Sequence, residues 1–130
     1  MEKIIDFLNK AAVYYLATTD GEKPHVRPLG FVMEYDGKLT FCTNNKKEMY
    51  KQMISNPYVE ISCFDGEDTL RISGKAVFVT SDDSQEKALE LVPRLKGMYS
   101  VGDGIYEIFS LDEVAAAFYT RSGEVKEVLI

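Results

Sequence analysis

Residues 13–43, VYYLATTDGEKPHVRPLGFVMEYDGKLTFCT, contain the pattern that decides the fold. Two Asp-Gly pairs, at 20–21 and 36–37, divide this stretch into three runs rich in β-branched and aromatic residues. An Asp-Gly pair between two such runs is a strong signal of a β-hairpin turn. The stretch therefore predicts an antiparallel meander, with strands at about 13–19, 23–35 and 38–43.

The rest of the chain predicts more strands and a few short helices. Apolar spacing indicates helices at about 2–12, 46–55 and 83–92, and strands at about 58–64, 69–80, 105–110 and 114–120. Ser81, Asp82 and Asp83 are suitable N-caps for the third helix. Six or seven antiparallel strands with short flanking helices are typical of a mainly β (α+β) barrel or sandwich.

Length and composition limit the class of protein. The 130 residues, 45% of them hydrophobic, suit a single domain over 1–130. The net charge of −6 repels nucleic acid, whereas a few local cations still suffice for a small phosphorylated ligand. No apolar run reaches the length of a membrane span and no signal peptide is evident, so we expect a cytoplasmic protein with its two cysteines reduced.

The segment His25–Gly30 is the first candidate for binding. Pro28 cannot donate to a sheet ladder and therefore belongs at an edge or a bulge, while Gly30 permits close approach to the backbone. Arg27 shares a strand face with His25 and Leu29. A cation beside exposed backbone suits a flat polar ring with a phosphate tail. The alternative is a kinked strand with a solvated arginine.

The segment Phe41–Lys47 is the second candidate. It is predicted to run from a strand end into a helix start, where free N–H groups and the helix dipole attract anions. Lys46 and Lys47 are expected in the first turn of that helix, where lysine opposes the dipole unless an anion lies between them. The alternative is that both are tolerated surface lysines. The hairpin at 36–37 predicts that the strand of Arg27 lies beside the strand ending at Thr43.

Seven motifs occur in an order that resembles the short members of the pyridoxamine 5′-phosphate oxidase-like FMN-binding family. They are Tyr15-Leu-Ala-Thr, Asp20-Gly, Arg27-Pro-Leu-Gly, Asp36-Gly-Lys-Leu, Phe41-Cys-Thr, Asn56-Pro-Tyr-Val-Glu-Ile and Leu70-Arg-Ile-Ser-Gly-Lys-Ala. The resemblance implies an antiparallel split β-barrel and a homodimer that holds FMN at the subunit interface. The acidic tail after Arg121 does not match the longer vitamin B6 oxidases, which makes vitamin B6 oxidation doubtful. A histidine that the nitroimidazole-reductase-like branch carries near the position of Cys42 is also absent.

The resemblance also implies site residues. Arg27 and Lys47 would hold the FMN phosphate, with Lys46 as the substitute for Lys47. Pro28, Leu29 and Gly30 would contact the ring or ribityl chain, and Cys42, Thr43 and Asn44 would edge the ring or phosphate. Gln52 is a further candidate, for a flavin carbonyl, with a solvated helix face as the alternative. Apart from the resemblance, Tyr99, Tyr106 and Tyr119 are candidates to lie over a flavin at a dimer interface, with core packing as the alternative.

The implied function is that of an oxidoreductase that passes electrons from a reduced nicotinamide or similar donor to a small substrate. No catalytic side chain is assigned, because the cofactor carries the chemistry. His25 is the only histidine, which excludes a histidine-rich metal site. Two alternatives stay open: a non-enzymatic flavin-binding module or redox sensor, and the same barrel holding a deazaflavin or haem.

Overall fold

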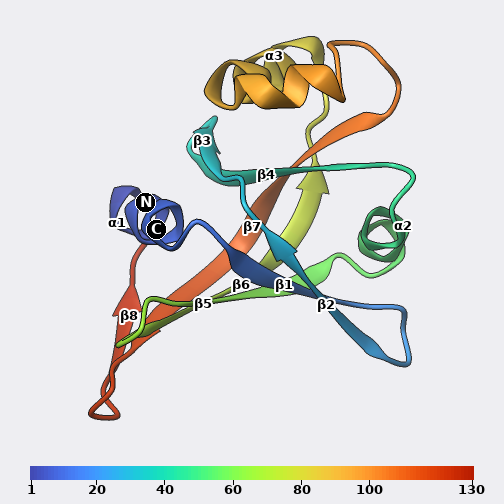
Figure 1. Ribbon diagram of the computed structural model, residues 1–130. Coiled ribbons are helices and arrows are strands. Elements are labelled where there is room, and N and C mark those ends of the chain that lie inside the picture. The colour runs from blue at the N-terminus through green and yellow to red at the C-terminus, as the bar shows by residue number, and fades with distance from the viewer.

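The computed structural model describes residues 1–130 and contains one eight-stranded antiparallel sheet with helices on its flanks (Figure 1). In chain order the elements are α1 (Glu2–Ala11), β1 (Tyr14–Thr19), β2 (Pro24–Leu29), β3 (Met33–Tyr35), β4 (Lys38–Asn44), α2 (Glu48–Ser55), β5 (Tyr58–Phe64), β6 (Thr69–Phe78), α3 (Asp82–Leu91), the 3-10 helix η1 (Pro93–Gly97), β7 (Tyr106–Tyr119) and β8 (Val125–Val128). The mainly β prediction with short flanking helices is confirmed.

The strand order is β2-β1-β5-β6-β7-β4-β3, with β8 pairing on β7. The two ends of this order, β2 and β3, are separated by only three residues of chain. Figure 1 shows the sheet coiling so that the chain crosses from β2 to β3 on one side of the molecule. The sheet therefore encloses a core, and residues 30–32 link its two ends.

The single strand expected at 23–35 is divided in two. Pro28 lacks an N–H for the ladder, and Gly30 passes so close to α1 that a Cβ there would lie 3.3 Å from the Ala12 carbonyl oxygen. β2 pairs with β1, placing Arg27 opposite Leu16, while β3 pairs with β4. The expectation that the strand of Arg27 pairs beside the strand ending at Thr43 is therefore wrong.

The last strands also differ from the expectation. A break between two strands was expected near 111–113, but β7 runs through these residues without interruption. Glu113 adopts a left-handed conformation (φ 52°), which lets β7 accommodate an extra residue. Between the pairs Ser73–Ala115 and Lys75–Asp112, β6 has one residue and β7 has two. This geometry is a β-bulge, which bends a strand without ending it. The expected extended tail forms β8.

The helices lie close to their predicted positions. Ser81 caps α3 in a capping box with Ser84, as its sequence favoured. α2 begins one residue after Lys47, which is its N-cap, and the first turn carries the acidic Glu48. The expected lysine pair in the first turn is therefore wrong, since the helix starts later than its apolar spacing indicated.

Two hydrophobic clusters organise the molecule. The larger fills the barrel and includes Ile4 and Leu8 of α1 and the stacked rings of Phe41 and Phe109. The smaller lies under α3 and consists of Met33, Ala88, Leu89, Tyr106 and Ile108. Burying each large apolar side chain stabilises the fold by about 1.5–3 kcal/mol. Through this second cluster α3 packs on β3 and β7, and residues 79–105 form a small lobe beside the barrel. None of the helices is long and apolar enough to cross a membrane.

Candidate functional site

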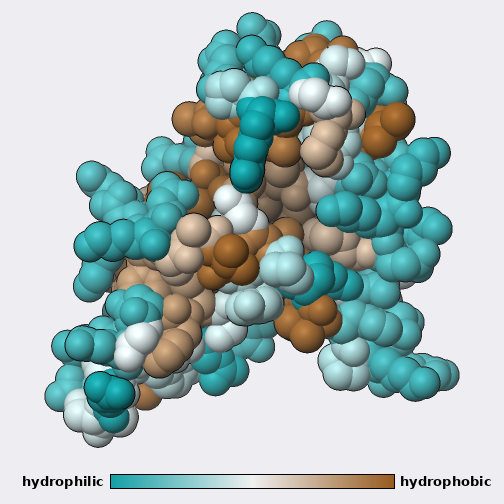
Figure 2. Space-filling view, in the orientation of Figure 1, coloured by the Kyte–Doolittle hydropathy of each residue, from teal (hydrophilic) through white to brown (hydrophobic).

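A cavity of about 190 Å³ lies between the barrel and the lobe, and we refer to it as the cleft. On the barrel side the cleft is lined by residues 28–31 at the end of β2 and just after it, by residues 42–43 near the end of β4, and by Lys47, the N-cap residue of α2. Its lobe wall comes from the end of α3, from η1 and from the residues after it. The lining residues are Pro28, Leu29, Gly30, Phe31, Cys42, Thr43, Lys47, Val92, Arg94, Leu95, Met98 and Tyr99. Figure 2 shows hydrophobic side chains in a hollow below the α3 lobe, with hydrophilic side chains around it.

Two contacts attach the lobe wall to the barrel. The Asn44 side-chain amide, at the end of β4, donates to the Tyr99 hydroxyl at 2.7 Å. The Tyr99 ring stacks on the buried Tyr106 ring, with centroids 4.5 Å apart and planes 14° apart. Pro93 opens η1, where its fixed backbone angle suits the first helical position. These contacts hold one wall of the cleft in place.

A buried polar atom in the cleft has no partner. Thr43 is 4% exposed, and its hydroxyl forms no hydrogen bond. Leaving such a group unpaired costs about 1–3 kcal/mol. Beside it, burial raises the pKa of the Cys42 thiol, so this side chain stays protonated at neutral pH. Thr43 is therefore available to a ligand, and Cys42 offers a neutral, largely apolar surface.

The charges in the cleft are of one sign. Lys47 and Arg94 line it from different elements, no carboxylate lines it, and neither cation forms an ion pair. An apolar floor between two unpaired cations suits a flat organic molecule that carries negative charge.

A second cavity, of about 420 Å³ and lined only by polar residues, surrounds Arg27; we call it the arginine pocket. The Arg27 guanidinium donates to the Thr18 hydroxyl at 2.7 Å and to Gln52 Oε1 at 3.1 Å. Partial burial lowers the pKa of Arg27 below its ordinary value. The remaining lining residues are Asp20, His25, Glu48, Lys51, Ser55 and Asn56.

The two cavities adjoin along the chain at two places. Arg27 lines the arginine pocket and Pro28, the next residue of β2, lines the cleft. In the same way, Lys47 lines the cleft and Glu48, the first residue of α2, lines the arginine pocket. An elongated ligand lying along β2 therefore has an apolar surface at one end and the Arg27 cation at the other.

The structure divides the predicted site residues between these cavities. Six of them line the cleft: Pro28, Leu29, Gly30, Cys42, Thr43 and Lys47. Arg27 and Gln52 meet in the arginine pocket, and Asn44 reaches the cleft wall through Tyr99. Lys46 is exposed and lines neither cavity.

The lobe wall is the part that sequence reasoning missed. Phe31, Val92, Arg94, Leu95 and Met98 were not predicted to line the site. The available signal was Pro93-Arg94 directly after the third predicted helix, where proline fixes a turn next to a cation. Among the tyrosine candidates Tyr99 lines the cleft, whereas Tyr106 is buried and Tyr119 lies on the outer face of the sheet.

Comparison with known proteins identifies the family. A family model described as pyridoxamine 5′-phosphate oxidase matches residues 1–101. The chain belongs to the pyridoxamine 5′-phosphate oxidase family. Within this family a solved NimC/NimA family protein from Clostridium acetobutylicum is 40% identical to it, with a TM-score of 0.91 over 98% of this chain and 93% of that one. Among curated proteins, none matches.

Two more distant family structures share the fold. General Stress Protein 26 from Bacillus anthracis is 19% identical, with a TM-score of 0.74 over 98% of this chain and 97% of that one. A pyridoxamine 5′-phosphate oxidase-related, FMN-binding protein from Nostoc punctiforme is 18% identical, with a TM-score of 0.64 over 99% and 95% of the two chains. These likenesses confirm the predicted split-barrel fold.

Proposed function

We propose that this protein binds FMN and acts as a cytoplasmic oxidoreductase on a small substrate. The observation that supports this most is the junction of the two cavities along β2. The ring system would lie in the cleft against Leu29, Gly30 and Thr43, and the phosphate would lie toward Arg27 and Lys47. The FMN-binding relative from Nostoc punctiforme supports the choice of cofactor.

The residues present fit this group. The unpaired Thr43 hydroxyl offers a hydrogen bond to a polar ring edge. Three cations that form no ion pair line the two cavities: Arg27, Lys47 and Arg94. Together they could pair with a phosphate and with one further negative charge. Bound FMN would supply the redox chemistry needed between a reduced nicotinamide or similar donor and the substrate. The protein orients the ring, pairs the phosphate and excludes water with the apolar side chains of the cleft.

A second copy of the chain would complete the site. At about 190 Å³ the cleft, which would hold the ring system, is smaller than the roughly 300–1,000 Å³ of a typical ligand pocket, so we expect a second chain to cover the open side of the ring. The exposed side of β1, β5, β6, β7 and β8 offers the surface for pairing, which we call the outer face. It carries the exposed apolar residues Tyr15, Tyr58, Phe64, Tyr119 and Val125. Exposed apolar residues gathered on one face of a sheet make that face a candidate interaction site.

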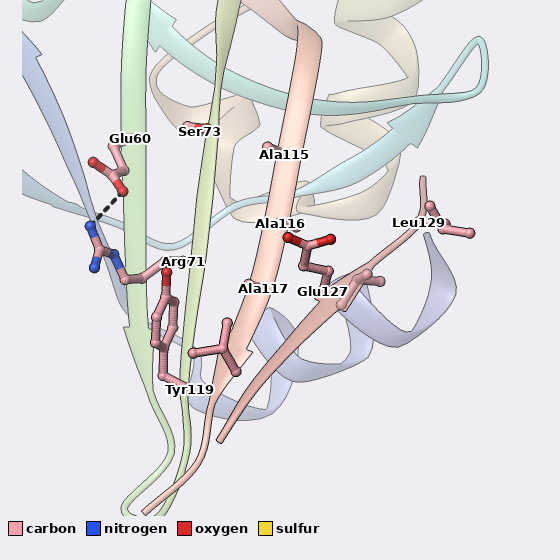
Figure 3. Close-up of a pocket in the computed structure, with 11 residues that line it drawn as sticks. Glu60, Arg71, Ser73, Ala115, Ala116, Ala117, Tyr119, Glu127 and Leu129 are labelled. Carbon is pink, nitrogen blue, oxygen red and sulfur yellow. Dashed lines mark hydrogen bonds and ion pairs between the residues drawn. The ribbon is translucent and has the colours of Figure 1, made fainter. Parts of the chain in front are cut away.

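The outer face is shaped at its centre by alanines. Ala115 and Ala117 of β7 leave a shallow cavity of about 320 Å³, bordered by Arg71, Tyr119 and Leu129 (Figure 3). Arg71 is held there by an ion pair to Glu60 at 2.9 Å and lies 5.2 Å from the centre of the Tyr119 ring. Leu129 at the edge of this cavity is 95% exposed in the single chain. We infer that this face forms the homodimer contact.

The experiment is to purify the protein, release any chromophore by heat and identify it by mass spectrometry. FMN is the expected result, and a deazaflavin or haem would contradict it. Changing Arg27 and Lys47 together to alanine should remove the flavin absorbance while circular dichroism still reports a folded barrel. Retention of FMN by that double variant would refute the phosphate site.

The cleft also favours a second candidate function, a flavin-binding module without catalysis. No histidine or carboxylate lines the cleft, and its one thiol is protonated. NADH or NADPH that bleaches the flavin within seconds supports the oxidoreductase. Bleaching by dithionite alone supports the module.

A further inference from the structure

Arg27 is fixed in position by uncharged groups only. Its Nη1 donates to the Leu16 carbonyl at 3.3 Å and to the Thr18 hydroxyl at 2.7 Å. Its Nη2 donates to Gln52 Oε1 at 3.1 Å, and the Thr18 hydroxyl donates to the same oxygen at 2.5 Å. The three side chains form a closed ring of hydrogen bonds, so the guanidinium has a fixed orientation.

The nearby carboxylates are already engaged. Asp20 pairs with His25 at 2.9 Å and accepts hydrogen bonds from the backbone N–H groups of Glu22 and Lys23. Glu48 pairs with Lys51 at 3.4 Å. No ion pair reaches Arg27, so its positive charge is held in place without being neutralised.

A second arginine of the same chain shows the opposite arrangement. Arg71 on the outer face is held by the Glu60 carboxylate at 2.9 Å. Gln52 has the shape of a glutamate and accepts from Arg27 in the same manner, but it brings no negative charge. A residue that served only to anchor an arginine would do so better as a glutamate, because a carboxylate adds an ion pair to the hydrogen bond and can accept from both sides of the guanidinium fork.

We propose that Thr18 and Gln52 are positioning residues that hold Arg27 for the anionic end of a ligand while leaving its charge free. This proposal rests on the proposed FMN site, and it assigns Gln52 to Arg27 rather than to a flavin carbonyl. Two N–H groups of Arg27, on Nε and Nη2, form no bond within the protein and are available to phosphate oxygens. The Thr18 hydroxyl is engaged by Arg27 and Gln52, and Thr18 lines neither the cleft nor the arginine pocket, so its hydroxyl acts through Arg27 and not on the ligand directly.

The test compares FMN with riboflavin, which lacks the phosphate. Apoprotein is titrated with each flavin for wild type, Gln52→Glu and Thr18→Val, following the quenching of flavin fluorescence. Wild type should bind FMN more tightly than riboflavin. Gln52→Glu should weaken FMN binding roughly tenfold or more, because the new carboxylate neutralises Arg27, and should leave riboflavin binding unchanged. Thr18→Val, which keeps the side-chain shape, should reduce the same preference by roughly threefold to tenfold.

Ser55→Glu is the matched control. Ser55 lines the same pocket on the same helix but forms no hydrogen bond with Arg27, so this variant adds the same charge away from the Gln52 position. Equal loss of FMN affinity in Ser55→Glu and Gln52→Glu would show a general field effect and overturn the assignment. Equal binding of FMN and riboflavin by wild type would also overturn it, while leaving a flavin site intact.

A flavin-free measurement separates this proposal from the proposed function. If wild type binds neither flavin, the FMN site is wrong, and inorganic phosphate then tests Arg27 alone. Phosphate should raise the thermal midpoint of wild type and of Ser55→Glu but not that of Gln52→Glu. A midpoint that phosphate leaves unchanged in wild type would contradict the proposal.

Discussion

The Asn44 side-chain amide donates to the hydroxyl of Tyr99 at 2.7 Å, and this bond joins the last residue of β4 to the lobe. Tyr99 lines the cleft from the lobe, and Asn44 directly follows Thr43, which lines the cleft from the barrel, so the bond ties the two walls together. Removing it leaves a half-buried amide donor unpaired and releases one wall.

Tyr99→Phe should therefore lower the free energy of unfolding by about 1 kcal/mol and weaken FMN binding several-fold. The phenyl ring still stacks on Tyr106, so the lobe stays folded. Denaturant unfolding and flavin titration measure the two effects. Tyr35→Phe is the control, because the Tyr35 hydroxyl also bonds the lobe, at Asp83, but away from the cleft. A Tyr35→Phe variant with the same loss of flavin affinity would contradict this role for Tyr99.

Lys47 and Lys46 are adjacent lysines with different surroundings. Lys47 lines the cleft and is the N-cap residue of α2, whereas Lys46 lines neither the cleft nor the arginine pocket. Lys47→Ala should weaken FMN binding roughly tenfold at low salt, with a smaller difference at high salt because ions screen the pair. Lys46→Ala should stay within about twofold of wild type. The reverse order in a flavin titration would identify Lys46 as the phosphate partner.

Phe64 tests the outer face as the dimer contact. It is 64% exposed at the end of β5, so Phe64→Glu should cost the single chain little. Burying the new charge between two copies is unfavourable, and the variant should sediment at the chain mass of 14.7 kDa rather than at twice that value. Ile54→Glu on α2 adds the same charge at another exposed apolar residue and should leave the dimer intact. A Phe64→Glu variant that remains dimeric with full flavin would place the contact elsewhere.

Cys42 reports ligand binding in the cleft. Because burial raises the pKa of its thiol, the reactive thiolate is scarce at neutral pH and iodoacetamide should label it several-fold more slowly than free cysteine. Raising the pH should speed labelling, and FMN should slow it further by covering the thiol. Cys42→Ser is the control, since Cys63 is 1% exposed and should contribute almost no labelling. Labelling of wild type at the same rate with and without bound FMN would place the flavin away from β4.

The sequence predicted local structure well where two residues suffice to define it. Asp36-Gly37 forms a turn with φ values of 51° and 75°, and Gly21 has a φ of 102° at the Asp20-Gly21 turn. Turns of this kind are encoded in the residues that form them. The same holds for the Ser81 cap of α3.

The misses share a different cause. The division of 23–35 depends on Ala12, a residue distant in sequence, approaching Gly30. The uninterrupted β7 depends on Gly74 of β6, where a Cβ would lie 3.2 Å from the Asp112 carbonyl oxygen and from Leu111 Cβ. Both are tertiary contacts, which periodicity along one segment does not contain. For the same reason the sequence predicted, wrongly, that the strand of Arg27 lies beside the strand ending at Thr43, whereas each residue lines its own cavity.

The lobe that closes the cleft has its own hydrophobic cluster, built on Ala88 and Leu89 of α3 with Tyr106 and Ile108 of β7. The barrel core and the contacts that hold the lobe therefore depend on different sets of buried residues. Substitutions at Val92, Arg94 or Met98 reshape one wall of the cleft without disturbing the core that forms the other wall. We expect a scaffold divided in this way to acquire a new substrate preference through changes at a few lobe residues, while the proposed cofactor contacts on β2 and β4 stay the same.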